Sequence, residues 1–201
     1  ARWMLDILGL PKQSATAFVT GATVANFTAL AAARNLVFKN AGWDVESDGL
    51  IGAPDLHIII SEESHPTVYK SLAMLGLGRN RVTKVKTDEQ GAISMEHFPE
   101  IQDNTIIITQ AGNINSGACD PISEICDLAA KKNTWVHVDG AFGLWAKASK
   151  KHQHLLNGYE KADSWATDAH KWLNVPYDSG LAFVKHEHAL KAAMAITASY
   201  L

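Results

Sequence analysis

The fold is decided by one stretch of sequence, Thr134-Trp135-Val136-His137-Val138-Asp139-Gly140-Ala141. Four of its first six residues are β-branched or aromatic, which predicts a strand. The nearly continuous apolar run is typical of a strand buried on both faces of a parallel sheet. Burying the carboxylate of Asp139 at the end of such a strand is costly unless it has a partner. Asp139 is therefore either a structural cap or the partner of a positively charged ligand atom.

Short apolar runs on both sides of this stretch alternate with helix-like segments. Further strands are predicted at residues 18–20, 56–61, 81–86, 104–109, 164–167 and 180–184. Helices are predicted at residues 2–8, 23–39, 66–75, 94–103, 121–132 and 187–195, and a loop rich in glycine at residues 41–54. This alternation predicts an α/β domain with a mostly parallel sheet flanked by helices.

Composition excludes several classes of protein. The 201 residues are 47% hydrophobic and 19% charged, which is ordinary for a folded domain with a sizeable core. The net charge of −3 comes without any basic block, so no nucleic-acid partner is expected. The longest aliphatic runs, at residues 58–60 and 106–108, predict strands and no membrane association. Cys119 and Cys126 form no disulfide or CxxC pattern, and two reduced thiols predict a cytoplasmic protein.

Ligands of parallel α/β sheets bind beyond the carboxyl ends of the strands, which directs attention to the residues that follow each strand. Thr20-Gly21-Ala22-Thr23 opens a long helix, whose N-terminus favours an anion such as phosphate, although Thr23 could be an ordinary cap. His65 could stack on a ligand or lie in a surface loop. The polar loop at residues 110–117 contains Asn113 and could be simple turn chemistry.

The last strand end carries an unusual lysine, in the sequence Asp168-Ala169-His170-Lys171-Trp172. A lone surface lysine is the default interpretation. An amine partly removed from water by His170 and Trp172 can instead form a Schiff base with a carbonyl. Phosphate donors, a ring-stacking histidine, a buried carboxylate and this amine are together the parts that a pyridoxal 5′-phosphate (PLP) site needs.

With these motifs in this order, the chain resembles the group II PLP-dependent decarboxylases, which act on aromatic amino acids, glutamate, histidine and cysteine sulfinate. Asp139 and Lys171, 32 residues apart, carry the most specific part of the resemblance, and Thr20 to Asn26 and Ser64 to Val68 support it. The resemblance implies the fold type I, aspartate-aminotransferase-like architecture. It covers essentially the whole chain.

The resemblance also implies a role for each matching residue. Lys171 would carry PLP as a Schiff base, and Asp139 would pair with the pyridinium nitrogen. His65 would stack on one face of the ring, and Ala141 would pack under the other face. His65, Asp139 and Lys171 are thus the predicted catalytic residues.

The remaining predicted cofactor ligands surround the phosphate and the ring oxygen. Ala22 and Thr23 would hold the phosphate, with help from Asp168 and His170, and Asn113 would lie near the ring oxygen or the substrate carboxylate. The sequence departs from the family in two ways. The family often has an acidic residue where Val24 stands, and some members have Asn where Asp168 stands. An anion close to the phosphate would need a water or His170 as a donor.

Relatives in this family are much longer than 201 residues. The resemblance therefore implies that residues 1–201 are the PLP-binding large domain, without the N-terminal segment that helps to form the substrate pocket. A mobile catalytic loop and a small C-terminal domain would follow the helix-like run that ends at Tyr200-Leu201. The family also implies a homodimer whose active sites use both subunits.

The predicted function is PLP-dependent decarboxylation of an L-amino acid. Two alternatives remain open. One is another fold type I PLP enzyme, such as an aldehyde synthase, a lyase or an aminotransferase, and the other is a non-catalytic dimerising fragment. No metal site is predicted, because the paired histidines at positions 152 and 154 and at positions 186 and 188 do not share a helix face and lack companion ligands.

Overall fold

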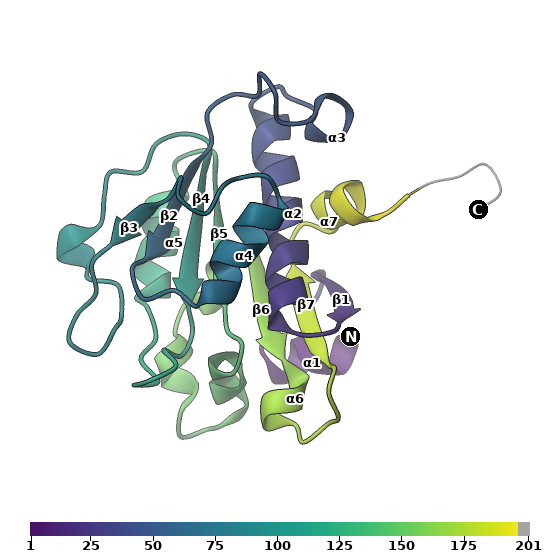
Figure 1. Ribbon diagram of the computed structural model, residues 1–201. Coiled ribbons are helices and arrows are strands. Elements are labelled where there is room, and N and C mark those ends of the chain that lie inside the picture. Colours follow the sequence, from purple (N-terminus) through teal and green to yellow (C-terminus); the bar gives the residue numbers. More distant parts are fainter. Residues whose placement is uncertain (197–201) are drawn as a thin grey trace.

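The computed structural model describes residues 1–196, so the predicted helix-like run ending at Leu201 lies outside the described residues. A seven-stranded sheet has the order β1-β7-β6-β5-β4-β2-β3, with helices on both faces (Figure 1). Its strands are β1 (Ala15–Val19), β2 (His57–Ser61), β3 (Thr83–Val85), β4 (Thr105–Gln110), β5 (Thr134–Asp139), β6 (Ser164–Asp168) and β7 (Gly180–Val184). The α-helices are α1 (Arg2–Ile7), α2 (Ala22–Asn40), α3 (Val45–Asp48), α4 (Pro66–Met74), α5 (Ile122–Ala129), α6 (Ala169–Trp172) and α7 (Glu187–Met194).

The strands of the sheet are parallel with one exception. Strands β3, β2, β4, β5 and β6 pair in parallel. Strand β7 is antiparallel to both β6 and β1, so β1 points the same way as the parallel group. The predicted α/β architecture with a mostly parallel sheet is confirmed, and the carboxyl ends of six strands meet at one edge.

Helices α2, α4 and α7 cover one face of the sheet (Figure 1). The segment forming α2 is rich in alanine and leucine and lacks glycine and proline, which favours a long helix. Isoleucines that alternate along β2 and β4 point toward these helices, at positions 58, 60, 106 and 108. Each fully buried side chain of this size contributes about 1.5–3 kcal/mol to folding.

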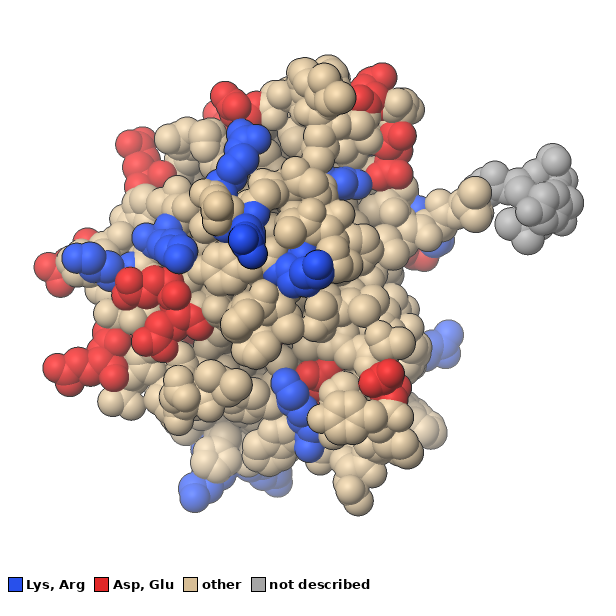
Figure 2. All heavy atoms as spheres, viewed as in Figure 1, with Lys and Arg blue, Asp and Glu red and all other residues tan. Residues whose placement is uncertain are grey.

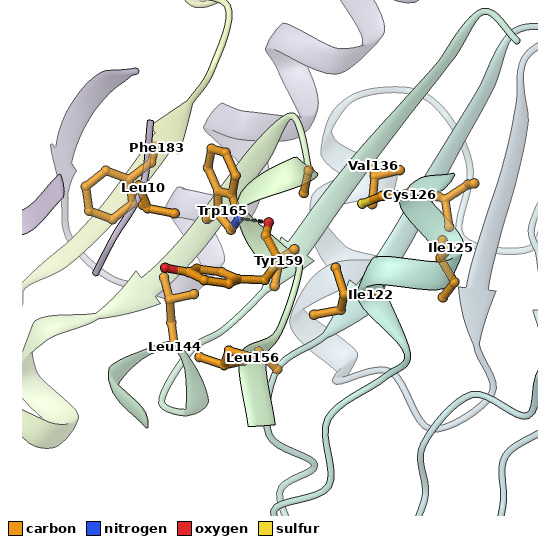
Figure 3. Close-up of a cluster of buried hydrophobic side chains, with 14 of the residues drawn as sticks. Leu10, Ile122, Ile125, Cys126, Val136, Leu144, Leu156, Tyr159, Trp165 and Phe183 are labelled. Atoms are coloured by element: carbon orange, nitrogen blue, oxygen red, sulfur yellow. Dashed lines mark hydrogen bonds between the residues drawn. The ribbon is translucent and has the colours of Figure 1, made fainter. Parts of the chain in front are cut away.

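The opposite face is covered by α1, α5 and three short 3₁₀ helices, η2 (Gly143–Ala148), η3 (Gln153–Leu156) and η4 (Tyr159–Lys161). Figure 3 shows the centre of this core, where the rings of Tyr159 and Trp165 lie among leucine and isoleucine side chains. The buried indole N–H of Trp165 donates to the carbonyl of Tyr159 at 2.9 Å. This bond satisfies the one polar group that burial of a tryptophan brings into the core.

Local structure differs from the sequence predictions at several elements. Strand β1 begins at Ala15, before the predicted residue 18, β3 is shorter than predicted, and the helical turn α6 was not predicted. The helix predicted at residues 94–103 is wrong, because only the 3₁₀ turn η1 (Met95–His97) forms. Pro99 restricts Phe98 to the extended conformation that the structure shows, which stops the helix. The loop predicted at residues 41–54 contains one helical turn, α3, capped by the side chain of Asp44. The three 3₁₀ helices between β5 and β6 were not predicted.

Charged side chains of both signs are scattered over the face shown in Figure 2, which is mostly uncharged. Basic side chains gather over α4 and the loop that follows it, and they include Lys70, Arg79, Arg81 and Lys84. Acidic side chains lie around them. Among residues 1–196, no helix combines the length and the apolar character needed to cross a membrane.

Candidate active site

A cavity of about 450 Å³ lies where the carboxyl ends of the parallel strands meet. It is bounded by the ends of β1, β4, β5 and β6 and by the first turns of α2, α4 and α6. Eight of the nine predicted cofactor ligands line it: Ala22, Thr23, His65, Asp139, Ala141, Asp168, His170 and Lys171. The structure therefore brings together residues that are up to 149 positions apart in the sequence.

Asp139, the last residue of β5, lines the cavity at what we call its Asp139 end, and is 5% exposed. Its carboxylate accepts hydrogen bonds from the side-chain amide of Asn26 at 3.1 Å and from the backbone N–H of Ala141 at 3.2 Å. Burial raises the pKa of Asp139, and these two bonds, with the charges of His65 and Lys171, partly offset that rise. The salt bridges within residues 1–196 do not include Asp139. A cationic ligand atom here would complete its environment.

Asp168, the last residue of β6, and Lys171 line the cavity at what we call its Asp168 end. The ammonium group of Lys171, which is 40% exposed, lies 3.0 Å from the Asp168 carboxylate. Asp168 also accepts from the backbone N–H of Ala22 at 2.6 Å and faces the ring of His170 at 3.4 Å. Three donors thus surround the acidic residue where some family members have Asn, and its charge is balanced locally.

A hydrogen bond to Nδ1 of His170 fixes the orientation of its ring. The backbone N–H of Ser179 donates to Nδ1 of His170 at 2.9 Å, so the ring proton lies on Nε2, which faces Asp168. The ring of Tyr177 stacks on His170 with centroids 4.0 Å apart. The indole N–H of Trp145 donates to the carbonyl of Asp168 and holds the strand end. His170 therefore orients Asp168 rather than lying free in the cavity.

The N-terminus of α2 opens into the cavity at Ala22, Thr23 and Val24. The first N–H groups of a helix have no acceptor within the helix, and that of Ala22 is taken by Asp168. The N–H groups of Thr23 and Val24 remain for an anion, which the helix dipole also favours. Gly180 of β7 packs directly on Gly21, because a Cβ at Gly180 would lie 2.6 Å from the Cα of Gly21.

His65 stands at the start of α4, where Pro66 occupies the first helical position. Its Nδ1 accepts from the backbone N–H of Thr67 at 3.3 Å and lies 2.8 Å from the Thr67 hydroxyl. The ring proton therefore lies on Nε2. These bonds hold the imidazole at the cavity wall, in a fixed orientation.

Asn113 is the predicted ligand that the structure does not place on the cavity wall. Its amide oxygen accepts from the backbone N–H groups of Asn115 and Ser116, and its N–H donates to Glu63 at 2.8 Å. The side chain of Asn113 thus stabilises the turn in which it lies and the contact of that turn with Glu63. Gln110, at the end of β4, lines the cavity instead.

Sequence reasoning missed Asn26, Gln110 and Phe142. Gln110 is the last residue of β4 and Phe142 comes three residues after β5, so the rule used for the other residues could have found them. Asn26 lies one turn after Ala22 within an apolar helix, and a buried amide in such a place needs a polar partner.

These groups fit PLP in three respects. The amine of Lys171 can react with an aldehyde, the buried Asp139 lacks a cationic partner, and the start of α2 offers N–H groups to a phosphate. His65 and Ala141 line the same cavity. The donor set therefore matches the cofactor at its aldehyde, its ring nitrogen and its phosphate.

Comparison with known proteins gives a match over the whole chain. Residues 1–201 match the family described as the pyridoxal-dependent decarboxylase conserved domain. The chain is 31% identical over 207 residues to an aromatic-L-amino-acid decarboxylase from Bacillus atrophaeus, a match that covers 99% of this chain and 41% of that protein. It is 34% identical over 185 residues to an aspartate 1-decarboxylase from Aliivibrio fischeri, covering 84% of this chain and 34% of that protein.

A solved structure shares the fold. The glutamate decarboxylase domain of diaminobutyrate-pyruvate transaminase and L-2,4-diaminobutyrate decarboxylase from Vibrio parahaemolyticus superposes with a TM-score of 0.85 and 30% identity. The match covers 96% of this chain and 44% of that one. The chain thus spans less than half the length of these three proteins.

Proposed function

Because this chain belongs to the pyridoxal-dependent decarboxylase family, we propose that it forms the cofactor-binding part of an enzyme that decarboxylates an L-amino acid. One observation carries the proposal. The amine of Lys171 and the buried carboxylate of Asp139 open into the same cavity. A cofactor that joins an aldehyde to a basic ring nitrogen fits between them.

In this proposal each end of the cavity has a separate task. When bound, PLP supplies the electron sink that accepts the electron pair of the carbon–carbon bond that breaks. Lys171 would hold the cofactor by its aldehyde, through the side-chain amine. Asp139 keeps the ring nitrogen protonated, which maintains the sink. His65 and Ala141 enclose the two faces of the ring.

The other cavity residues position these groups. Asp168 holds the Lys171 ammonium in place through the 3.0 Å ion pair, and His170 in turn orients Asp168. The N–H groups of Thr23 and Val24 bind the phosphate. The phenyl ring of Phe142 lines the cavity and excludes water from its wall.

We also propose that the working unit is a homodimer in the cytoplasm. The side chains of Trp3, Phe18 and Trp172 are each more than half exposed, and covering such surface supports assembly with a second copy. Cys119 and Cys126 are both unpaired, which suits a reducing compartment. Sedimentation velocity tests the dimer, and fractionation of the host cell tests the location.

The decisive test is labelling of the lysine. The protein incubated with PLP should develop the visible absorbance band of a lysine-bound cofactor. Borohydride reduction and peptide mapping should then place the label on Lys171, while a label on Lys70, Lys147 or Lys185 would contradict the assignment. Lys171→Ala should abolish both the band and the label, and Lys147→Ala is the control that should retain both.

Activity is measured on the natural full-length protein with a panel of L-amino acids. Release of CO2 together with an amine supports a decarboxylase. An aldehyde product would support the synthase alternative. Labelling of Lys171 without any turnover by the full-length protein would support a cofactor-binding but non-catalytic role.

A further inference from the structure

A row of buried polar side chains lies behind Asp139, between β5, β6 and α2. The indole N–H of Trp135 donates to the hydroxyl of Ser164 at 2.8 Å, and the same hydroxyl lies 2.8 Å from Nδ1 of His137. Nε2 of His137 lies 2.9 Å from the amide oxygen of Asn26, whose N–H donates to Asp139 at 3.1 Å. All five side chains are at most 5% exposed.

The geometry of the strands explains why these groups meet. Trp135, His137 and Asp139 alternate along β5 and so share the face of the sheet that α2 covers. Ser164 lies opposite His137 in the pairing of β5 with β6. Asn26 reaches the same face from the second turn of α2. The pairing register of β5 with β6 therefore brings these side chains together, and α2 completes the row.

The hydrogen bonds of this row run in one direction. An indole N–H can only donate, so the Ser164 hydroxyl accepts from Trp135 and has its own proton to give to Nδ1 of His137. The proton of a neutral imidazole then lies on Nε2 and is donated to the oxygen of Asn26. The amide N–H of Asn26 is left facing Asp139.

The opposite direction fits poorly. It would place the amide oxygen of Asn26 against the Asp139 carboxylate, which is tolerable only when Asp139 is protonated. It would also leave the Ser164 hydroxyl proton without an acceptor among the described residues. Donation that starts at Trp135 and ends at Asp139 is therefore the arrangement that is compatible with an ionised Asp139 carboxylate.

We propose that Trp135, Ser164, His137 and Asn26 form a directed hydrogen-bond chain that holds Asp139 as an anion, oriented for the ring nitrogen of the cofactor. The inference rests on the proposed function only for the identity of that ring. The four residues act through Asp139 and are positioning residues. Asn26 donates the hydrogen bond to Asp139, and Trp135, which can only donate, sets the direction in which the bonds of the chain run.

The electrostatic surroundings agree with this arrangement. Burial lowers the pKa of His137 to about 3, so its imidazole is neutral and carries a single N–H throughout the physiological range. The hydrogen bond from Asn26 lowers the pKa of Asp139 against the opposing effect of burial. The charged or titratable groups that face Asp139 from other elements are His65 of α4 and Lys171 of α6.

The first experiment needs no cofactor. In apoprotein labelled with ¹⁵N-histidine, the ring nitrogens of His137 should show the proton on Nε2, and His137→Phe assigns the signal. The ¹³C signal of the Asp139 carboxyl gives its titration. Asn26→Leu should raise the pKa of Asp139 by about 1–2 units, because a hydrogen bond to the charged form is lost.

The second experiment measures the ring nitrogen in the holoprotein with ¹⁵N-labelled PLP. Asn26→Leu should shift the nitrogen signal toward the unprotonated form, and Ser164→Ala and Trp135→Phe should shift it less. Thr109→Val is the matched control, because Thr109 also loses a buried hydroxyl bond near His137, to its carbonyl, but lies outside the chain. It should leave the signal unchanged.

The outcomes separate this inference from the proposed function. A His137 proton on Nδ1, or an Asp139 titration that Asn26→Leu does not change, overturns the directed chain even where PLP binds normally. Equal ¹⁵N shifts in Asn26→Leu and Thr109→Val overturn it as well. Failure of the wild type to bind PLP contradicts the proposed function, while the histidine and carboxyl signals of the apoprotein still decide the chain.

Discussion

The two ends of the cavity each present a buried aspartate, and the two differ in their partners. Asp168 lies 3.0 Å from the ammonium of Lys171 and accepts a further N–H bond from Ala22. Asp139 accepts only from neutral amides, those of Asn26 and Ala141. Burial raises the pKa of Asp139, and its two hydrogen bonds and the charges of His65 and Lys171 offset that rise only in part.

This difference indicates where a ligand must supply charge. At the Asp168 end the chain already balances its own charges, so a ligand gains by exchanging with the lysine. At the Asp139 end the carboxylate is desolvated and lacks a cationic partner, so a protonated ligand nitrogen stabilises it. Burying Asp139 without a cationic partner thus lowers the stability of the fold, and the same burial prepares a site for a cationic ligand atom.

Of the substitutions that test this difference between the two aspartates, Asp139→Asn should cause the largest loss of turnover. Removing one partner of a buried ion pair costs about 3–5 kcal/mol, so turnover should fall by about 10²–10⁴-fold. Steady-state kinetics of the full-length protein and the absorbance of bound PLP measure the loss.

The same substitution should not weaken the apoprotein. Folding raises the pKa of Asp139, so above its unfolded-state pKa the carboxylate opposes folding, and a neutral amide removes that penalty. Above about pH 7 the thermal midpoint should be equal to or higher than that of the wild type. Normal turnover, or a much lower midpoint, would show that Asp139 serves the fold.

Asp120 serves as a reference for the two cavity aspartates, because it is a buried carboxylate that does not line the cavity. It accepts from the backbone N–H groups of Ile93 and Gln110 at 2.8 and 2.6 Å, and burial raises its pKa to about 6. An acid whose pKa is raised by folding binds more protons in the folded state, so its contribution to stability falls as the pH rises from about 4 to about 6.

The measurement is urea unfolding of the apoprotein at about pH 4 and about pH 7. The stability of the wild type relative to Asp120→Asn should fall by about 2–3 kcal/mol over that interval. PLP affinity should be far less affected than by Asp139→Asn. A constant difference between the two proteins would mean that Asp120 does not titrate in this range.

Asp168→Asn should have the smallest effect of the three. The amide oxygen can still accept from Ala22, and only the ion pair with Lys171 is lost. Because Lys171 is 40% exposed, solvent screens that pair and the loss is about 1 kcal/mol or less, or up to about fivefold in turnover. Asp168→Ala, which also removes the acceptor for Ala22, should be worse. A loss as large as that of Asp139→Asn would contradict the distinction between the two ends.

Much of the fold could be predicted from local sequence. Strands β5 and β7 begin and end at the residues predicted for them, because short, mostly apolar runs bounded by polar residues leave little choice. The helix at residues 94–103 was wrong because helix propensity was counted across Pro99. Eight of the nine predicted cofactor ligands line one cavity because strand ends in a parallel sheet converge.

The remainder depends on contacts that no local pattern contains. Asn26 and Asp139 are 113 residues apart, and their bond exists only because α2 packs across β5. Asn113 follows a strand end as expected, but the turn N–H groups of Asn115 and Ser116 engage its side chain first. A polar residue near a strand end is therefore a ligand only where its own loop leaves it free.

The bond between α2 and β5 also has a consequence for synthesis of the protein on the ribosome. The strands that α2 covers most closely, β5, β6 and β7, all follow residue 133. At about 5–20 residues per second, the 113 residues between Asn26 and Asp139 take about 6–23 s to translate. During that interval the alanine- and leucine-rich helix lacks β5, β6 and β7, so the nascent chain exposes part of an apolar segment on which chaperones can act.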